Sequence, residues 1–391
     1  MKVTIVGAGM GGLSVAALLS RTGQHDITVL EQASGFHEAG YGIGLYPLGA
    51  MVFNAIGRGQ QLRDKAVILN TYKVHGPDGE LLQSIDLSEL LSAYGPMLGV
   101  TRTDMISILQ SAVPDGVIQF GSRVKAAHPV VDGDGKCDGN GVSVTLENGQ
   151  TIDSDIVVAA DGMHSAIRRS LFGEVAPHET GFNAWVWWAP LSLTERDTVS
   201  EYWGPSAFVG LYPMREFINV AVGVPKELSP EPSDSPEEVL RALRAIVAQH
   251  APAVAELPHL WEAVGKPFLW PMLDVRAPAL TALDDRVALL GDAGVGFLPT
   301  AGVGASNALR SGAALAYELS LSDKASAQAG MRRWRKRIEK TVHGNQNDSR
   351  QLAKLMMVKH NSTSALINLL MKHMPITATT NSIIKSMEEP F

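Results

Sequence analysis

The chain has 391 residues, more than the roughly 250–300 at which one hydrophobic core usually stops growing, so we expect two interlocked domains. Apolar residues make up 45% and charged residues 19%, which is typical of a globular protein, and the net charge of -7 gives no electrostatic reason to expect nucleic acid as a partner. The single cysteine, Cys137, excludes an internal disulfide and a cysteine-based zinc cluster, and we expect no metal site.

The first thirty residues have the pattern of a strand–helix–strand unit. Residues 2–6 form a short β-branched run, which predicts a buried parallel strand rather than a signal peptide. Glycines break this run, residues 13–21 then predict a helix, and residues 27–30 predict a second strand. No stretch of about 18 uncharged apolar residues follows, so we expect a cytoplasmic protein without an integral membrane segment.

The turn after the first strand contains Gly7, Gly9 and Gly12 in a GxGxxG pattern. The first glycine permits the tight turn, the second lets the backbone approach a pyrophosphate, and the third lets helix and strand pack closely. Glu31 lies 19 residues beyond Gly12, at the end of the second strand, where a carboxylate would accept hydrogen bonds from a ribose. This spacing predicts a dinucleotide site but does not separate NAD from FAD.

Two later apolar runs end in similar turns. Residues 156–160 precede Asp161 and Gly162, and residues 287–290 precede Gly291 and Asp292. We therefore expect both runs to be buried strands of the same parallel sheet, which distant segments would assemble.

The middle of the chain has a different residue composition. Aromatic and β-branched residues dominate from 183 to 224, which predicts antiparallel strands. Phe208 and Tyr212 flank Gly210 on one of these strands, so they should share a face. Residues 228–238 predict a loop that caps a helix starting near Pro236, and the chain from residue 305 onward predicts mostly helix.

Several segments together resemble one enzyme family. Residues 158–168 (VAADGMHSAIR) resemble the Asp-Gly motif of the class A flavin-dependent aromatic monooxygenases, the para-hydroxybenzoate hydroxylase family, and residues 291–304 resemble that family's Gly-Asp motif. Residues 40–45 are similar to its loop near the isoalloxazine, and Arg102 matches its helix-start arginine. The resemblance spans nearly the whole chain in the family's order.

The resemblance implies an α/β fold with a Rossmann-type FAD-binding domain around a parallel sheet, a β-sheet-rich substrate domain and C-terminal helices. The boundaries that we expect are 1–70, 98–175 and 270–345 for the discontinuous FAD-binding domain, 71–97 and 176–269 for the substrate domain, and 346–391 for the C-terminal helical segment.

The resemblance also implies the chemistry. In that family NAD(P)H is a transient electron donor to FAD, and O2 adds to the reduced ring to give a C4a-hydroperoxide that hydroxylates an aromatic or polycyclic small molecule. The cofactor carries the difficult chemistry, so no side chain need be a nucleophile. The protein positions the substrate, excludes water and stabilises charge.

The resemblance assigns roles to individual residues. Asp292 would bind the ribityl chain, Arg102 would give charge-assisted bonds to the cofactor, and Pro299 and Gly302 would lie near the flavin ring. The residues expected to contact FAD are Gly7, Gly9, Gly11, Gly12, Glu31, Gln32, Gly42, Ile43, Arg102, Val124, Asp161, Gly291, Asp292, Gly302, Val303, Gly304 and Ala305. The residues expected to contact the substrate are Trp187, Phe208, Tyr212 and Phe297.

Four positions depart from the family pattern. His37 stands where the family has arginine, Gly294 where it has histidine, and Val303 where it has glutamine, while residues 310–311 replace an acidic pair. These departures bear on how the pyrophosphate and the nicotinamide donor are held. His37 is either a pyrophosphate contact or a surface histidine.

Other functions on the same fold stay open at this point. Residues 185–190 (WVWWAP) approach the Trp-x-Trp-x-Ile-Pro motif of flavin-dependent halogenases, with Ala189 in place of isoleucine. An FAD-dependent reductase or dehydrogenase and a non-catalytic flavin-binding protein are further alternatives. The sequence leaves open the substrate, NADH versus NADPH, hydroxylation versus another oxygenation, and a monomer versus a homodimer.

Overall fold

A six-stranded sheet forms the centre of one half of the molecule, with the strand order β18-β19-β12-β1-β2-β8. We call this the first half, although its strands come from both ends of the chain. We describe a computed structural model, and the residues that it describes are 1–36, 40–131, 137–191, 195–373 and 381–387. The central strands pair in parallel, which confirms the prediction that distant segments build one parallel sheet. The strands are β1 (Lys2–Val6), β2 (Asp26–Leu30), β8 (Ile118–Gln119), β12 (Ile156–Ala159), β18 (Thr281–Ala282) and β19 (Val287–Leu289).

Helices cover this sheet and form the largest core with it. Leu13 of α1 and Leu309 of α9 are both fully buried in that core. Helix α1 begins at Met10, three residues before the predicted start, so Gly11 and Gly12 lie in its first turn. The helices are α1 (Met10–Ser20), α2 (Pro47–Ala55), α3 (Gly59–Lys65), α5 (Arg102–Gln110), α6 (Ala166–Phe172) and α9 (Gly304–Ser320).

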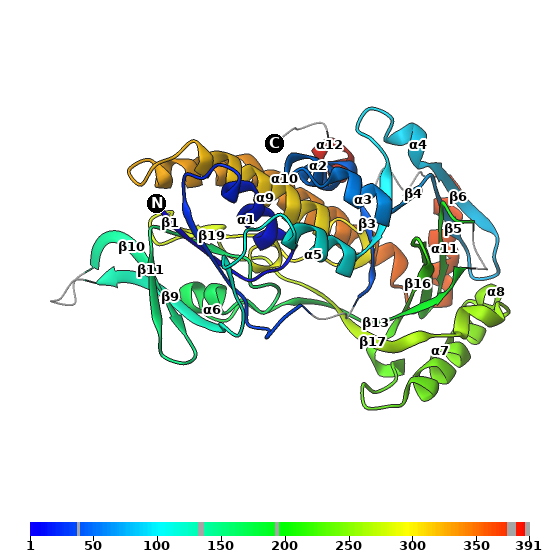
Figure 1. Cartoon of the computed structure of the whole chain (residues 1–391). Coiled ribbons are helices and arrows are strands. Elements are labelled where there is room, and N and C mark those ends of the chain that lie inside the picture. Colours follow the sequence, from blue (N-terminus) through cyan, green and yellow to red (C-terminus); the bar gives the residue numbers. More distant parts are fainter. Residues whose placement is uncertain (37–39, 132–136, 192–194, 374–380, 388–391) are drawn as a thin grey trace.

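Two small sheets flank the central one. The first joins β3 (Gly42–Leu45), β7 (Met97–Thr101) and β4 (Val67–Leu69). The second joins β9 (Val124–Val131), β10 (Cys137–Leu146) and β11 (Thr151–Ser154), and it projects at one end of the molecule (Figure 1).

A seven-stranded sheet forms the other half, with the order β17-β13-β16-β15-β14-β5-β6. Its pairs are antiparallel, as predicted for residues 183–224, except that β14 and β5 run parallel. Its strands are β5 (Thr71–His75), β6 (Leu81–Asp86), β13 (His178–Pro190), β14 (Thr198–Gly204), β15 (Ala207–Pro213), β16 (Phe217–Pro225) and β17 (Val264–Asp274).

One face of the seven-stranded sheet packs on α7 (Pro236–His250), which precedes the short α8 (Pro252–Ala255). Helix α7 begins where the sequence predicts, because Ser235 and Glu238 form a reciprocal capping box at its start. Both helices lie at the end of the molecule away from β9–β11 (Figure 1).

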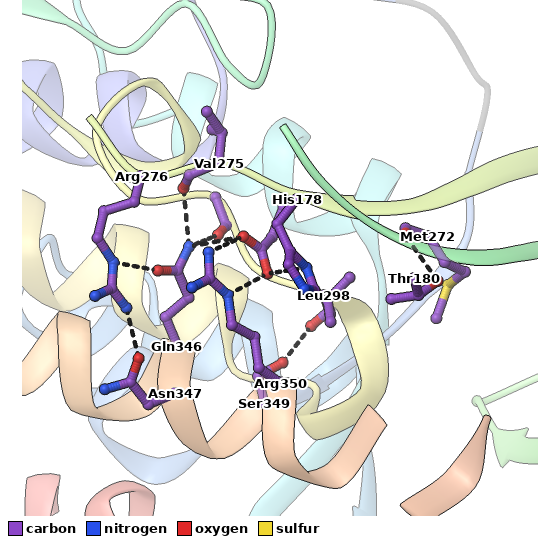
Figure 2. A network of polar contacts seen from close by, with 12 residues as sticks. His178, Thr180, Met272, Val275, Arg276, Leu298, Gln346, Asn347, Ser349 and Arg350 are labelled. Atoms are coloured by element: carbon purple, nitrogen blue, oxygen red, sulfur yellow. Dashed lines mark hydrogen bonds and ion pairs between the residues drawn. The ribbon is translucent and has the colours of Figure 1, made fainter. Parts of the chain in front are cut away.

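The long helix α10 (Ala327–Met356) is joined by hydrogen bonds to the end of β17, the edge strand of the seven-stranded sheet. Arg350 donates two hydrogen bonds to the fully buried carboxylate of Asp274 at the end of β17, and its Nε lies 2.8 Å from Oδ2. Gln346 donates to the carbonyl oxygen of Val275 at 2.8 Å and accepts from Arg276 at 2.6 Å, so α10 and the chain after β17 form one polar network (Figure 2). The division of the chain into domains stays a prediction.

The chain continues after α10 through α11 (Asn361–Met371) and α12 (Asn381–Ser386), and α4 (Leu87–Leu90) follows β6. In the described part of the chain, no helix combines the length and apolar character needed to cross a membrane.

Candidate cofactor and substrate site

The glycine-rich turn between β1 and α1 has little room for side chains on its protein side. Gly7 has a φ of +100°, which favours glycine, and a β-carbon there would overlap the carbonyl oxygen of Ala160. A β-carbon at Gly12 would overlap the carbonyl oxygen of Gly7. At Gly9, by contrast, no described protein atom lies within 4 Å of an added β-carbon. The turn is therefore closed toward the protein and open at Gly9, as a pyrophosphate contact requires.

Glu31, at the end of β2, holds this turn in place. Its carboxylate accepts a hydrogen bond from the N–H of Ala8 at 2.8 Å and another from the N–H of Ala33 at 2.9 Å. The N–H of Ser122 donates to the Glu31 carbonyl oxygen at 2.8 Å, which brings the segment before Val124 alongside. The next residue, Gln32, is exposed. His37 lies outside the described residues.

Arg168 connects the Asp-Gly segment to the Gly-Asp segment. Its guanidinium donates to the carbonyl oxygen of Met163 at 2.6 Å and to that of Ala293 at 2.9 Å. In the sequence, Arg168 is only the last residue of the Asp-Gly motif, and that motif is the signal that could have identified it. A β-carbon at nearby Gly294 would come within 2.9 Å of the Leu280 side chain, so histidine does not fit there without a shift.

The two carboxylates that these segments carry are in different surroundings. Oδ2 of Asp161 accepts from the N–H of Ile167 at 3.2 Å, whereas its buried Oδ1 has no hydrogen-bond partner among the described residues. Burial raises the pKa of Asp161. The side chain of Asp292 is accessible to solvent, although protein atoms surround its carboxylate. Desolvation by these atoms raises the pKa of Asp292 to about 6, and the positive charge of Arg168 partly opposes the rise.

Strand β3 and the start of α5 meet beside the seven-stranded sheet. The N–H of Gly42 donates to Asn219 Oδ1 at 2.8 Å, and a β-carbon at Gly42 would come within 2.7 Å of Asn219. The N–H of Arg102 donates to the carbonyl oxygen of Tyr41 at 3.0 Å, and the guanidinium carbon of Arg102 lies 6.0 Å from the Tyr41 ring centroid. Tyr41 also packs edge-on against Trp270, with centroids 4.5 Å apart. The sequence analysis assigned neither aromatic residue a role, although Tyr41 lies within the loop of residues 40–45; Trp270 belongs to no motif.

The loop from residue 291 to α9 is held in a defined shape. Gly302 adopts a left-handed conformation with φ +63° after a short 3-10 turn over Pro299–Ala301, and no described atom lies within 4 Å of a β-carbon added there. Tyr46 fastens this turn, because its hydroxyl donates to the Ala301 carbonyl oxygen at 3.1 Å. Val303 is buried, and Gly304 and Ala305 begin α9.

A pocket joins this loop to the seven-stranded sheet. Pro299 and Gly302 line it together with Tyr212 and Glu201. The rest of the lining is mostly apolar and includes Leu69, Leu87, Leu91, Met97, Ile383 of α12 and Met387 just after that helix.

The structure brings Tyr212 to the pocket but not the other three residues expected at the substrate. Phe208 lies on the same sheet face as Tyr212, as predicted, and packs in a core cluster with Leu352, which lines the pocket, and Met356. Phe297 is buried in the core of the first half, beside Gly304.

The structure places Trp187 away from this pocket, and its contact with a substrate stays a prediction. Its ring lies on the opposite face of the sheet, where it packs with α7 and with Trp261 at a centroid distance of 5.7 Å. Its indole N–H donates to the Leu260 carbonyl oxygen at 3.2 Å. Alternation along β13 turns Trp187 toward the helix, and the same alternation puts the adjacent Trp188 on the Tyr212 face.

The residues present fit a flavin dinucleotide. The open backbone at Gly9 suits a pyrophosphate, Glu31 ends β2 where this motif expects a ribose-binding acid, and the unpartnered Oδ1 of Asp161 is a free acceptor. The accessible Asp292 and the open turn at Gly302, which lines the pocket, complete this set of groups. Fold and site together define a dinucleotide-binding flavoprotein.

Comparison with known proteins gives the family. The family described as "FAD binding domain" matches residues 1–332, most of the chain, and the chain belongs to this family. A 6-hydroxynicotinate 3-monooxygenase from Pseudomonas fluorescens is 30% identical over 329 residues, which cover 81% of each protein. An aurachin C monooxygenase/isomerase from Stigmatella aurantiaca is 28% identical over 332 residues, 82% of this chain and 81% of that protein. These relatives place the chain among the FAD-dependent monooxygenases.

Solved structures show the same fold. Klebsiella pneumoniae HpxO, crystallised with FAD and uric acid, superposes with a TM-score of 0.85 at 22% identity, over 99% of this chain and 97% of that one. The structure of CtdE in complex with FAD and its substrate superposes with a TM-score of 0.79 at 19% identity, over 99% of both chains.

Proposed function

We propose that the chain uses FAD, NAD(P)H and O2 to hydroxylate a small aromatic or polycyclic substrate. The observation that carries this proposal is the pocket that Pro299 and Gly302 share with Tyr212 and Glu201. The expected flavin loop and the aromatic sheet line one cavity, so a bound aromatic would lie against the cofactor.

The chain's own residues would bind and orient the cofactor. Glu31 would accept the ribose hydroxyls at the end of β2, the backbone at Gly9 would approach the pyrophosphate, and Asp292 would hold the ribityl chain. Arg102 would supply positive charge beside Tyr41. FAD, when bound, supplies the electron transfer and the oxygen activation.

The pocket walls would exclude water from the reacting atoms. Leu69, Leu87, Leu91 and Met97 carry no polar side-chain group that would hold a water, and all but the last are buried. An apolar wall of this kind strengthens the few polar interactions inside and protects reactive species from solvent.

The nicotinamide donor would bind transiently in a shared cleft. The chain has one strand–GxGxxG–helix unit, and FAD would occupy it. We therefore expect weak saturation by NAD(P)H. A tight, stoichiometric NADP complex of the oxidised, substrate-free protein in calorimetry would contradict this part of the proposal.

The test is oxygen uptake by the purified yellow protein with NADPH or NADH and a panel of aromatics. We expect at least one aromatic to accelerate NAD(P)H oxidation with matched O2 consumption and an oxygenated product. Product formation that depends on chloride would identify a halogenase instead. Turnover without O2 consumption would identify a reductase, and a yellow protein without any NAD(P)H oxidation would be a non-catalytic flavin binder. The relatives described above do not favour these alternatives.

A further inference from the structure

Glu201 is a buried carboxylate at the polar end of the substrate pocket. It is 2% exposed and lies on β14, and it is one of the residues that line the pocket. Oε2 accepts from the Tyr72 hydroxyl at 2.6 Å and from the indole N–H of Trp203 at 2.9 Å, and Oε1 accepts from the Tyr212 hydroxyl at 2.7 Å. Burial raises the pKa of Glu201, and the three hydrogen-bond donors around it oppose that rise. Because a carboxylate has about four acceptor positions, Oε1 keeps one for a further donor.

The backbone places Tyr212 over Glu201. Gly210 pairs directly with Glu201 across the β14–β15 ladder, and it lies two residues before Tyr212 on the same face. A β-carbon at Gly210 would overlap the Tyr212 ring. The missing side chain therefore lets the tyrosine lie flat across its own strand and reach the carboxylate.

The hydroxyl groups that line the pocket face it as acceptors. Tyr72 and Tyr212 donate their protons to Glu201, and burial raises the pKa of both hydroxyls well above the usual range, so they keep those protons. Tyr46 donates to the Ala301 carbonyl oxygen, and Thr300 donates to that of Ser349 at 2.9 Å. A hydroxyl has only one proton, so none of these side chains has one left for a ligand.

The charged side chains of the pocket also disfavour an anionic ligand. Among the described residues that line it, Glu201 is the one carboxylate and none is lysine, arginine or histidine. A ligand carboxylate would therefore enter an apolar pocket with neither a cation nor a hydroxyl donor, beside a buried acid. Burying an unpaired charge in this way is strongly unfavourable.

We propose that the pocket selects a neutral aromatic substrate whose O–H or N–H group donates a hydrogen bond to the Glu201–Tyr72–Tyr212 cluster, and that it rejects aromatic carboxylates. This inference rests on the proposed function, because it takes the pocket as the substrate site. Glu201 is then a specificity-determining residue.

The test uses three probes of one ring system, which are 2-naphthol, its methyl ether 2-methoxynaphthalene, and 6-hydroxy-2-naphthoate. Binding to the FAD-loaded protein at pH 7.5 is measured by calorimetry, which needs no turnover. We expect 2-naphthol to bind at least about tenfold more tightly than the ether, since a hydrogen bond to a charged group contributes about 1.5–3 kcal/mol. We expect the naphthoate to bind at least about tenfold more weakly than 2-naphthol.

Two variants assign the effect to the cluster. Glu201→Gln keeps the shape but replaces an acceptor by an amide donor, so the preference for 2-naphthol over its ether should fall toward one and the naphthoate should gain affinity. Tyr212→Phe should lower the same preference while keeping the ring. The matched control is Glu195→Gln, because Glu195 is an exposed glutamate near the start of the same strand, paired with Lys73 at 2.9 Å, and this variant should behave like the wild type.

The wild-type comparison alone overturns the inference if the ether binds as tightly as 2-naphthol, if the naphthoate binds as tightly, or if 2-naphthol does not bind. The wild-type comparison therefore tests the inference even if the Glu201→Gln variant fails to fold. Failure of the proposed function has another signature, which is that no aromatic stimulates O2 consumption in the NAD(P)H assay whatever the binding preference.

Discussion

Arg168 of α6 donates a 2.9 Å hydrogen bond to the carbonyl oxygen of Ala293, 125 residues further along the chain. The same guanidinium binds the Met163 carbonyl oxygen, so one buried cation joins the two segments that carry Asp161 and Asp292. The two carboxylates expected at the cofactor are therefore positioned by a residue that need not touch the cofactor itself.

Arg168→Ala should loosen both segments. We expect the free energy of unfolding to fall by about 2–4 kcal/mol, because three carbonyl oxygens lose a charged donor, and FAD to be retained less well. Urea unfolding and the flavin content after gel filtration measure the two effects. Arg169→Ala is the control, since Arg169 is exposed and pairs with an exposed Glu174, and it should change stability by less than about 0.5 kcal/mol. Equal losses in both variants would contradict the role of Arg168.

Two glycines of the first turn should respond differently to the same change. A β-carbon added at Gly9 meets no described protein atom within 4 Å, so Gly9→Val should fold with a native circular dichroism spectrum but lose FAD. Gly12→Val should fail to fold, because its β-carbon would overlap the Gly7 carbonyl oxygen. A yellow Gly9→Val protein would show that the cofactor does not approach this turn.

Stability of the FAD-free protein should depend on pH through Asp292. Although Asp292 is accessible to solvent, desolvation by the surrounding protein raises its folded-state pKa to about 6 from an ordinary value of 3.8, so the folded state holds the proton more tightly than the unfolded state. The resulting cost is absent below about pH 4, grows as the pH rises from 4 to 6, and is complete above 6.

Asp292→Asn removes that cost, so the FAD-free variant should have a higher Tm than the wild type at pH 7 and an equal Tm at pH 4. Thermal unfolding across this range measures the difference. A Tm difference that is the same at both pH values would show that Asp292 ionises normally in the folded protein.

Arg350→Met should leave the buried Asp274 carboxylate without its cation. Removing one partner of a buried pair costs about 3–5 kcal/mol, and we expect a loss of that size in urea unfolding. The double variant with Asp274→Asn should recover part of it, because the unpaired charge is gone. Lys226→Met, which breaks an exposed pair with Glu179, should cost about 1 kcal/mol or less. No recovery in the double variant would argue against the buried charge as the cause.

The sequence by itself determined the elements and the order of the cofactor segments. The β-branched runs at residues 2–6, 156–160 and 287–290 form neighbouring parallel strands, and Ser235 caps the start of α7. These features could be predicted because strand propensity, turn residues and caps act over a few residues. The constraint at Gly12 is likewise local, because it comes from the Gly7 carbonyl oxygen, whereas the overlap at Gly7 involves the distant Ala160.

Only the tertiary structure decided which face of each strand meets the pocket. Alternation shows that Trp187 and Trp188 point to opposite faces, but not that α7 covers the Trp187 face. Glu201 carries no motif, and it became the polar end of the pocket through its pairing with Gly210 and through Tyr72, which comes from a strand 129 positions earlier. Such contacts depend on register and packing between distant segments, and no local pattern in the chain encodes them.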